Sequence, residues 1–169
     1  MWLRCGHNSL SENLETSHPI VRRLCADDID RLYTIETESY PFPWTRSIFV
    51  DCLRVGYACF GLQIGKDLVG YSIFNWAAGE AHLLNLCIHP RWQRKGYGDL
   101  MLDHTVHYVA RLEVSRLFLE VRESNPAAIS LYQKAGFEVI GKRKRYYQAG
   151  EEREDAIVMS LEVRSKLIS

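Results

Sequence analysis

Residues 89–99 read His89-Pro90-Arg91-Trp92-Gln93-Arg94-Lys95-Gly96-Tyr97-Gly98-Asp99 and join a predicted strand to a predicted helix. Gly96 and Gly98 let backbone N–H groups approach an anion closely, and the N-terminus of the following helix attracts negative charge. Arg91, Arg94 and Lys95 add positive charge to the same loop. The segment therefore predicts a site for a phosphate-rich ligand such as a pyrophosphate. The alternative is a solvated basic turn in which the glycines serve only the backbone conformation.

Strand and helix patterns extend from this loop in both directions. Upstream, they predict strands at 20–24, 58–64, 68–75 and 80–88, helices at 27–35 and 46–53, and a rigid aromatic loop at 40–44. Downstream, they predict helices at about 99–112 and at 126–135, and strands at 116–121, 138–147 and 154–163. Thr45 is the expected N-cap of the second helix. This order predicts one α/β domain of the α+β type, with a mixed central sheet of about seven strands flanked by about four helices.

The composition is that of one soluble domain, with 169 residues of which 47% are hydrophobic and 25% charged. We expect a polar leader at residues 1–18, the folded domain at 19–164 and a short tail at 165–169. The 21 basic and 21 acidic side chains cancel, so charge alone recruits neither nucleic acid nor an anionic membrane. No apolar run approaches the roughly 20 residues that span a bilayer, and the first residues lack the apolar centre of a secretion signal. The expected location is the cytoplasm.

The cysteines and histidines are too scattered to indicate a disulfide or a metal centre. The cysteines are Cys5, Cys25, Cys52, Cys59 and Cys87, and they form no CxxC pair. His82 and His89 lie seven residues apart, and His104 and His107 share a helical pattern without a cysteine or an HExxH motif beside them. We therefore expect free, mostly buried thiols and no metal site.

A second informative stretch, residues 119–138, reads LEVRESNPAAISLYQKAGFE. Asn125 before a proline is a good helix N-cap, and Gly136 suits the position just after the helix end. Glu120 lies on the strand before this helix and Tyr132 on the helix itself, so a carboxylate and a phenol are expected in one cleft. Taken alone, Glu120 is more simply a surface or salt-bridged carboxylate, Tyr132 a core aromatic, and Asn125 only a cap.

Together, the two stretches resemble the GNAT family of acetyl-CoA-dependent N-acetyltransferases. The first carries the pattern QxxGxG at Gln93, Gly96 and Gly98, and it matches neither a Walker loop nor a dinucleotide-binding glycine pattern. The second ends in YxxxGF at 132–137. The second stretch, the FPW loop at 42–44 and the segments 145–147 and 153–159 are similar to the branch that acetylates the N-terminal alanine of a small-subunit ribosomal protein. The resemblance covers nearly all of residues 20–163.

This resemblance implies direct transfer from acetyl-CoA, the cosubstrate, to the N-terminus of a ribosomal protein in a ternary complex. It assigns Glu120 as proton acceptor, directly or through a water, and Tyr132 as proton donor to the coenzyme A sulfur. Cofactor contacts are implied for a bulged strand at Leu86, Cys87 and Ile88, for the loop residues Arg94, Lys95, Gly96, Tyr97, Gly98 and Asp99, and for Asn125. Acceptor contacts are implied for Phe42, Trp44, Tyr146 and Tyr147. Without the resemblance, 86–88 is an ordinary buried strand and Phe42 and Trp44 are core anchors.

The chain departs from the family pattern at Asp99, where a basic or small residue is common near the diphosphate. An acid there repels phosphate, unless it points away and only favours the helix N-terminus. The long leader before Pro19 is a second departure.

Other functions stay open at this point. The acceptor is alternatively a lysine side chain, a polyamine or another small amine, and an acidic cluster in the acceptor pocket would favour this. A non-catalytic coenzyme A binding module would lack the base, whereas Glu120 and Tyr132 are both present. An acetyl-cysteine route is disfavoured because Cys87 lies in an apolar strand without an obvious histidine partner.

Overall fold

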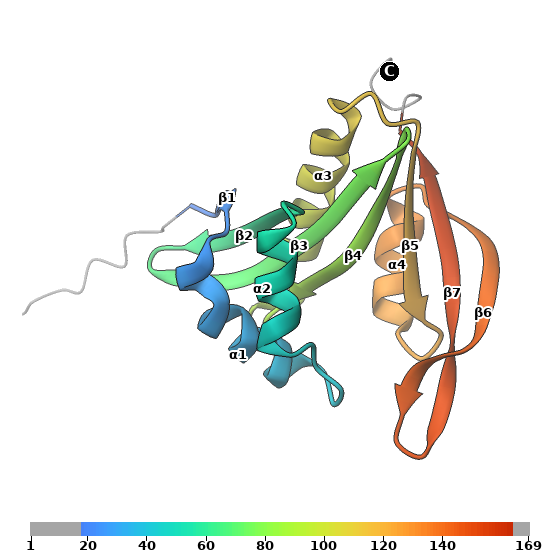
Figure 1. Cartoon of the computed structure of the whole chain (residues 1–169), viewed down its shortest axis with the longest axis horizontal. Coiled ribbons are helices and arrows are strands. Elements are labelled where there is room, and N and C mark those ends of the chain that lie inside the picture. The colour runs from blue at the N-terminus through green and yellow to red at the C-terminus, as the bar shows by residue number, and fades with distance from the viewer. Residues whose placement is uncertain (1–17, 164–169) are drawn as a thin grey trace, which may run out of the picture.

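The structure is a computed structural model that describes residues 18–163. Except for His18, the predicted leader lies outside the described residues, as do residue 164 and the predicted tail. In the described part, a seven-stranded sheet in the order β1-β2-β3-β4-β5-β7-β6 is covered by four α-helices (Figure 1). The predicted single domain with a mixed sheet is confirmed.

The strands are β1 (Ile20–Arg23), β2 (Ala58–Ile64), β3 (Asp67–Ala77), β4 (Glu80–Ile88), β5 (Arg116–Arg122), β6 (Glu138–Ala149) and β7 (Glu152–Glu162). The helices are α1 (Ile29–Ser39), α2 (Arg46–Arg54), α3 (Tyr97–Ala110) and α4 (Pro126–Lys134), with short 3-10 helices η1 (Ala26–Asp28) and η2 (Pro90–Trp92). The C-terminal strands do not follow sequence order, because β7 lies between β5 and β6 and pairs with both in antiparallel orientation.

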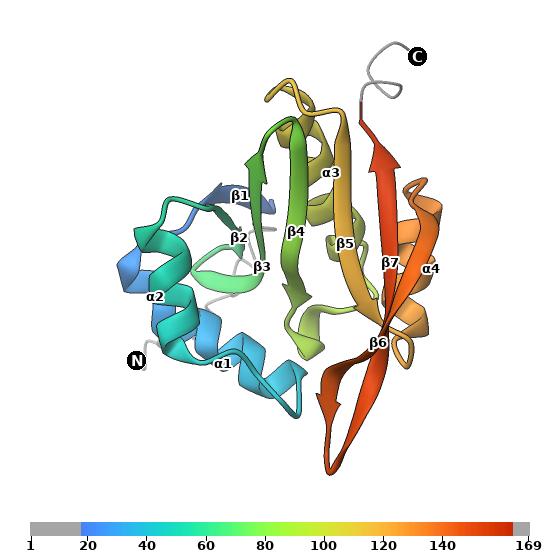
Figure 2. The same ribbon diagram turned by 45° about the vertical axis from the view of Figure 1, so that its right-hand side comes forward.

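The helices lie on both faces of the sheet and enclose two cores (Figure 2). On one face, α1 and α2 pack Leu32, Ile35 and Phe49 against Tyr71 and Ile73 of β3. On the other face, α3 and α4 cover a second set of buried residues that includes Met101, Leu102, Leu117, Leu119 and Met159. Strand side chains alternate between the two faces, so apolar strands in the middle of the sheet supply both cores. Within residues 18–163, no helix has the length and apolar character needed to cross a membrane.

The parallel pair at the centre of the sheet separates along its length. β4 and β5 pair only over Glu80–Leu83 and Arg116–Leu119. Both strands then continue, β4 to Ile88 and β5 to Arg122. Figure 1 shows the two strands diverging beyond the shared segment. The backbone groups on the facing edges of the two strands therefore have no strand partner there.

A bulge in β4 marks the point where the two strands part. Ile73 of β3 faces Asn85 and Phe74 faces Leu83, so Leu84 has no partner on β3. A bulge bends its strand and increases the local twist, which turns β4 away from β5. The bulge thus precedes residues 86–88, where the family resemblance implies it, and those residues keep regular pairing with β3.

Local signals set the helix ends with one partial exception. Asn125 caps α4 by accepting a hydrogen bond from the Ala128 N–H at 3.1 Å, as predicted. Gly136 follows the helix with a φ of +94°, which confirms the predicted end. Thr45 occupies the N-cap position of α2, but its hydroxyl bonds to the Ser47 hydroxyl at 2.7 Å and does not cap the helix. Helix α3 starts two residues earlier than predicted because Gly96, with a φ of +82°, takes the N-cap.

A partly buried ion pair at the start of the domain should make the protein less stable at acidic pH. Arg22 donates from Nη1 and Nη2 to the two Asp28 carboxyl oxygens, at 2.8 and 2.7 Å. These hydrogen bonds lower the pKa of Asp28 to about 2, against the opposing effect of burial. An Asp in the unfolded chain has a pKa of about 3.9. The pair therefore stabilises the fold fully above that pH, and the stabilisation is lost as the pH falls toward 2. Asp28→Asn should lower the free energy of unfolding at pH 7 by about 2 kcal/mol, measured by urea denaturation.

The same measurement between pH 7 and pH 2 supplies the control. Asp30→Asn removes an exposed ion pair with Arg46 and should change the free energy of unfolding by less than about 0.5 kcal/mol. An equally steep loss of stability on acidification in wild type and in Asp28→Asn would contradict the assignment.

Candidate active site

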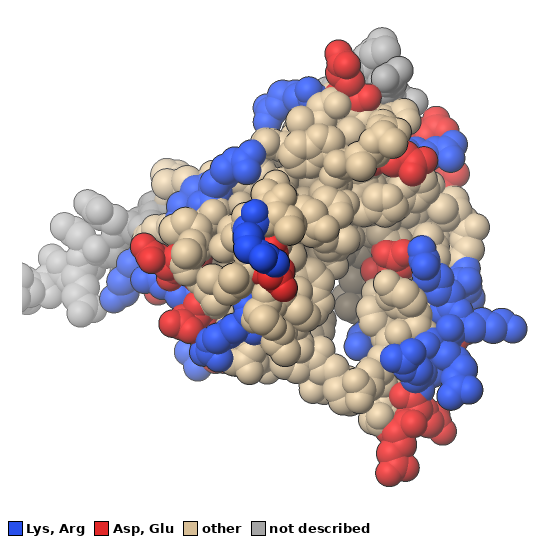
Figure 3. Space-filling model, viewed as in Figure 1, with Lys and Arg blue, Asp and Glu red and all other residues tan. Residues whose placement is uncertain are grey.

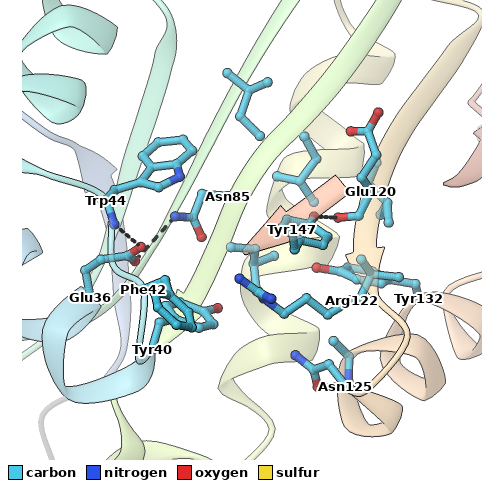
Figure 4. Close-up of a pocket in the computed structure, with 16 residues that line it drawn as sticks. Glu36, Tyr40, Phe42, Trp44, Asn85, Glu120, Arg122, Asn125, Tyr132 and Tyr147 are labelled. Atoms are coloured by element: carbon cyan, nitrogen blue, oxygen red, sulfur yellow. Dashed lines mark hydrogen bonds between the residues drawn. The ribbon is translucent and has the colours of Figure 1, made fainter. Parts of the chain in front are cut away.

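A cleft opens where β4 and β5 separate, and the α1–α2 loop and β6 complete its walls. The space-filling view shows a hollow between the two halves of the molecule (Figure 3), and the close-up shows the residues around it (Figure 4). The sequence-predicted residues that line the cleft are Phe42, Trp44, Leu86, Glu120, Asn125, Tyr132 and Tyr147. Those that do not line it are Cys87, Ile88, Tyr146 and the loop residues 94–99.

The loop between α1 and α2 forms one wall of the cleft. Its two prolines exclude a helical conformation in the residues before them. Tyr40, Phe42 and Trp44 line the cleft from this loop. Trp44 also packs against Phe49 of α2, with ring centroids 5.7 Å apart, whereas Phe42 is 38% exposed. Trp44 is therefore both a core anchor and a wall residue, and Phe42 is available to a ligand.

Tyr147 of β6 forms part of the opposite wall. Its hydroxyl donates to the backbone carbonyl of Glu120 at 3.0 Å, and the Arg122 guanidinium lies 4.4 Å from its ring centroid. Burial raises the pKa of Tyr147 to about 12, so it stays neutral. Tyr146 is 43% exposed and contacts the Tyr147 ring edge-on. Tyr146 lies outside the cleft lining, in a part of β6 where the register is irregular.

Glu120 faces the cleft from β5, but its carboxylate points away from the Tyr132 hydroxyl (Figure 4). Its Oε1 forms an ion pair with Arg143 Nε at 3.1 Å. The adjacent strand residues Leu119 and Val121 belong to the core under α3 and α4. Strand alternation therefore turns the Glu120 side chain to the other face of the sheet. The two groups share one cleft, as predicted, without touching each other.

Tyr132 approaches the cleft from α4. It is 7% exposed, and its ring packs against Phe137 with centroids 5.7 Å apart. Burial raises the pKa of Tyr132 above its ordinary value, and Tyr147 and Cys87 act in the same direction. The phenol therefore keeps its proton at neutral pH, which suits a proton donor.

Glu36 of α1 is a cleft residue that the sequence did not single out. It is 2% exposed and lies on the wall opposite Glu120 (Figure 4). Its carboxylate accepts hydrogen bonds from the Trp44 backbone N–H at 2.9 Å, from the Tyr71 hydroxyl, and from Asn85 Nδ2 at 3.4 Å. Burial raises the pKa of Tyr71, so this hydroxyl keeps the proton that it donates.

A sequence signal for Glu36 exists, although it is weak. Glu36 follows Leu32 by four residues, so the two side chains share the buried face of α1. A carboxylate on an apolar helix face needs a hydrogen-bond or charged partner when it is buried.

Arg122 also lines the cleft, and its side chain pairs with Glu154 of β7 at 3.2 Å. No local signal predicts the pairing of Arg122 with Glu154, since Glu154 lies on a distant strand.

The glycine loop leads from β4 into α3 and leaves the helix N-terminus open. Gly96 is the N-cap, and a Cβ built on it would meet no atom within 4 Å. The first turn of α3 thus has no side-chain cap, and its N–H groups are free to bind an anion. Gln93 fixes the start of the loop by donating from Nε2 to the Ile88 carbonyl at 2.9 Å. Lys95 Nζ lies 4.9 Å from the Trp92 ring centroid. The loop therefore fits a phosphate-bearing group.

The Asp99 carboxylate is neutralised by a cation from the neighbouring helix. Lys134 Nζ of α4 lies 2.7 Å from Asp99 Oδ1. The ion pair draws the Asp99 carboxylate toward α4. Lys134 thus balances the negative charge by which the loop departs from the family pattern.

The β4 backbone supplies polar groups to the gap left by β5. The His89 N–H donates to the Val69 carbonyl at 2.9 Å. Along an antiparallel pair, the N–H and C=O groups of successive residues point alternately toward the partner strand and away from it. The backbone groups of Cys87 therefore also face β3, whereas those of Leu86 and Ile88 face the opposite side. That side is the one from which β5 has separated. It fits an extended ligand with its own amide and carbonyl groups.

The described cysteines, Cys25, Cys52, Cys59 and Cys87, are free thiols, and Cys5 lies outside the described residues. Burial raises the pKa of Cys87 to about 12. Its thiol donates to the Ser39 hydroxyl at 3.2 Å. Cys87 therefore stays protonated and unreactive as a nucleophile.

The chain is similar to known acetyltransferases along most of its length. The sequence profile of the Acetyltransferase (GNAT) family matches residues 29–137. A ribosomal protein bS18-alanine N-acetyltransferase from Escherichia coli is 35% identical over 136 residues, which are 80% of this chain and 92% of that protein. The crystal structure of a ribosomal-protein-alanine N-acetyltransferase from Escherichia coli matches with a TM-score of 0.81 at 34% identity, covering 86% of this chain and 94% of the other. A chimeric spermidine N-acetyltransferase from Vibrio cholerae reaches a TM-score of 0.79 at 19% identity over 90% of this chain and all of the other, a likeness of fold alone.

Proposed function

The chain belongs to the GNAT acetyltransferase family, and on this premise we propose that it acetylates the N-terminal alanine of a small-subunit ribosomal protein. The family uses acetyl-CoA as cosubstrate. Support for the acceptor comes from the Escherichia coli relative, which is named for the alanine of a ribosomal protein and is similar over 80% of this chain. The fold alone does not select the acceptor, since the spermidine enzyme has it too.

The observation that carries the proposal is the composition of the cleft. A carboxylate at Glu120, a neutral phenol at Tyr132 and aromatic walls at Phe42 and Tyr147 surround the gap between β4 and β5. Acetyl transfer to an amine requires a proton acceptor, a proton donor and alignment of the two reactants. The cleft contains groups suited to each of these tasks.

The glycine loop, the open edge of β4 and Asn125 are suited to acetyl-CoA. The uncapped first turn of α3, with Arg94 and Lys95 beside it, is suited to the diphosphate. The backbone groups of Leu86 and Ile88 that face the gap are suited to the amides of the pantetheine arm and to the thioester carbonyl. Asn125 caps α4 through its oxygen, so its amide nitrogen is left for the cofactor. When bound, acetyl-CoA supplies the acetyl group as a thioester.

The protein's own part in the reaction is proton transfer. A peptide α-amino group has a pKa of about 7.7–8.0 and is mostly protonated at pH 7, so a base must remove its proton. Glu120 takes that proton, directly or through a water. Tyr132 gives its hydroxyl proton to the departing sulfur. Because the Cys87 thiol is buried and protonated, the route is direct transfer without an acetyl-cysteine.

A polyamine acceptor has less support from the cleft. A polycation calls for clustered carboxylates, whereas Glu36 and Glu120 are accompanied by Arg122 in the lining and by Arg143 at its rim. Basic side chains gather over β6 at this rim (Figure 3), where residues 142–145 are exposed. The charge balance thus favours a single amine at the end of a chain.

Acetyl-CoA turnover against a panel of amines tests the proposal. The panel contains peptides that begin Ala-Arg, Ser, Met and Gly, together with spermidine and free lysine, and thiol release is the readout. We expect the Ala-Arg peptide to be turned over with a kcat/KM at least about tenfold above that of spermidine or lysine, because only a peptide fills both aromatic walls.

Each other result assigns a different function. Turnover of the small amines alone would leave the GNAT family membership intact and overturn the acceptor. Tight binding of acetyl-CoA without turnover of any amine would identify a binding module.

A further inference from the structure

Glu36, the second carboxylate of the cleft, takes no part in the proton transfers proposed for Glu120 and Tyr132. Glu36 and Glu120 lie on opposite walls (Figure 4). Glu120 has a cationic partner in Arg143, at 3.1 Å. Within residues 18–163, the hydrogen-bond donors to Glu36 are all neutral and no Lys, Arg or His pairs with it. The cleft therefore contains a buried carboxylate without a counter-charge from the described chain.

The Glu36 carboxylate has room for one more donor. A carboxylate offers about four acceptor positions. Oε2 receives the Tyr71 hydroxyl and Asn85 Nδ2, whereas Oε1 receives only the Trp44 N–H. One position on Oε1 is thus open in a residue that lines the cleft.

These features favour a cation that enters from the cleft. Burying a carboxylate is costly unless the charge is paired or fully hydrogen-bonded. Tyr71 and Asn85 hold the Glu36 carboxylate from β3 and β4, and Trp44 holds it from the aromatic loop, so the carboxylate has one orientation. The wall next to it includes Tyr40 and Phe42, which are suited to the apolar part of a small N-terminal residue.

We propose that Glu36 binds the α-amino group of the acceptor, an inference that rests on the proposed function. The ammonium form pairs with Oε1 of Glu36 when the acceptor enters. After Glu120 has taken one proton, the neutral amine still donates an N–H to the same oxygen, and its lone pair is left to attack the acetyl group. Glu36 thus binds and orients the nucleophile, whereas Glu120 moves the proton.

The test compares two ligands on two proteins by isothermal titration calorimetry, with coenzyme A saturating. One ligand is a peptide that begins Ala-Arg, and the other is the same peptide with hydrogen in place of its α-amino group. Wild type should bind the amino peptide on the order of tenfold more tightly than the des-amino peptide, the size of one hydrogen bond to a charged group. Glu36→Gln should reduce that ratio to within about twofold.

The design separates acceptor binding from structural support of the loop. Glutamine retains an oxygen for the Trp44 N–H, and both peptides are measured on one preparation, so any loss of folded protein cancels in the ratio. The matched control is Asp30→Asn, which removes a carboxylate from the exposed side of the same helix. It should keep the wild-type ratio.

Three outcomes overturn the inference. If the ratio of affinities for the amino and des-amino peptides is the same in Glu36→Gln as in wild type, Glu36 does not contact the amine. An equal loss of affinity for both peptides shows that Glu36 only supports the aromatic loop. If wild type acetylates no α-amine peptide in the panel assay, the proposed function itself fails, and the inference falls with it.

Discussion

Glu120→Gln should lower kcat/KM for the Ala-Arg peptide about 10²- to 10⁴-fold at pH 7, with the KM for acetyl-CoA unchanged. This is the size of one general-base step. Glutamine has the shape of glutamate, and the change leaves the Glu120 backbone carbonyl to accept the Tyr147 hydroxyl at 3.0 Å. The cleft wall therefore persists while the proton acceptor is lost. Steady-state thiol release at varied peptide and acetyl-CoA concentrations measures both parameters.

The pH dependence makes this prediction specific to proton removal. The acceptor amine loses its own proton above its pKa of about 7.7–8.0, so the deficit of Glu120→Gln should shrink at higher pH. Glu123→Gln is the matched control, because Glu123 follows β5 and pairs with Lys142 on the exposed surface. It should retain wild-type kinetics. A deficit that is the same at pH 7 and at pH 9.5 would argue against a proton acceptor at Glu120.

Tyr132→Phe should lower kcat about 10²- to 10⁴-fold with little change in either KM. The substitution keeps the ring that packs against Phe137 and removes only the hydroxyl. Burial raises the pKa of Tyr132, so the phenol stays protonated across the usual assay range. The ratio of wild-type to variant kcat should therefore be constant between pH 7 and pH 9, in contrast to the deficit of Glu120→Gln.

The control for Tyr132 is another helical tyrosine away from the cleft. Tyr108 of α3 packs against the same core as Tyr132 but does not line the cleft, and its hydroxyl accepts a hydrogen bond from Arg23. Tyr108→Phe should leave kcat unchanged. Equal kcat values for Tyr132→Phe and wild type would remove Tyr132 from the proton-transfer scheme.

Much of the fold follows from signals that act over a few residues. The prolines of the aromatic loop, Asn125 at the start of α4 and Gly136 after it fix backbone conformation locally, so the element boundaries could be predicted. The start of α3 differs from the predicted one. The helix was expected to start near Asp99, but a glycine in a left-handed conformation caps it directly, and only the backbone geometry reveals that.

The relations between distant segments could not be predicted from the residues themselves. Glu36 accepts hydrogen bonds from residues 35 and 49 positions away, Tyr71 and Asn85, and nothing in the local pattern of α1 names them. The direction of Glu120 depends on which face of β5 the helices α3 and α4 cover. The family resemblance predicts roles for Glu120 and Tyr132, whereas the position of Glu36 opposite Glu120 follows only from the packing of α1 on the sheet.

The position of β7 between β5 and β6 also bears on when the enzyme becomes active during its own synthesis. A ribosome delivers β5 and α4 before β6 and β7, yet β5 pairs along its whole length only with β7. At about 5–20 residues per second, the nascent chain carries β5 with one edge unpaired for several seconds. Tyr147, which lines the cleft, arrives on the same late hairpin. The chain thus completes the glycine loop first, and the wall of the cleft at Tyr147 only once the β6–β7 hairpin has emerged.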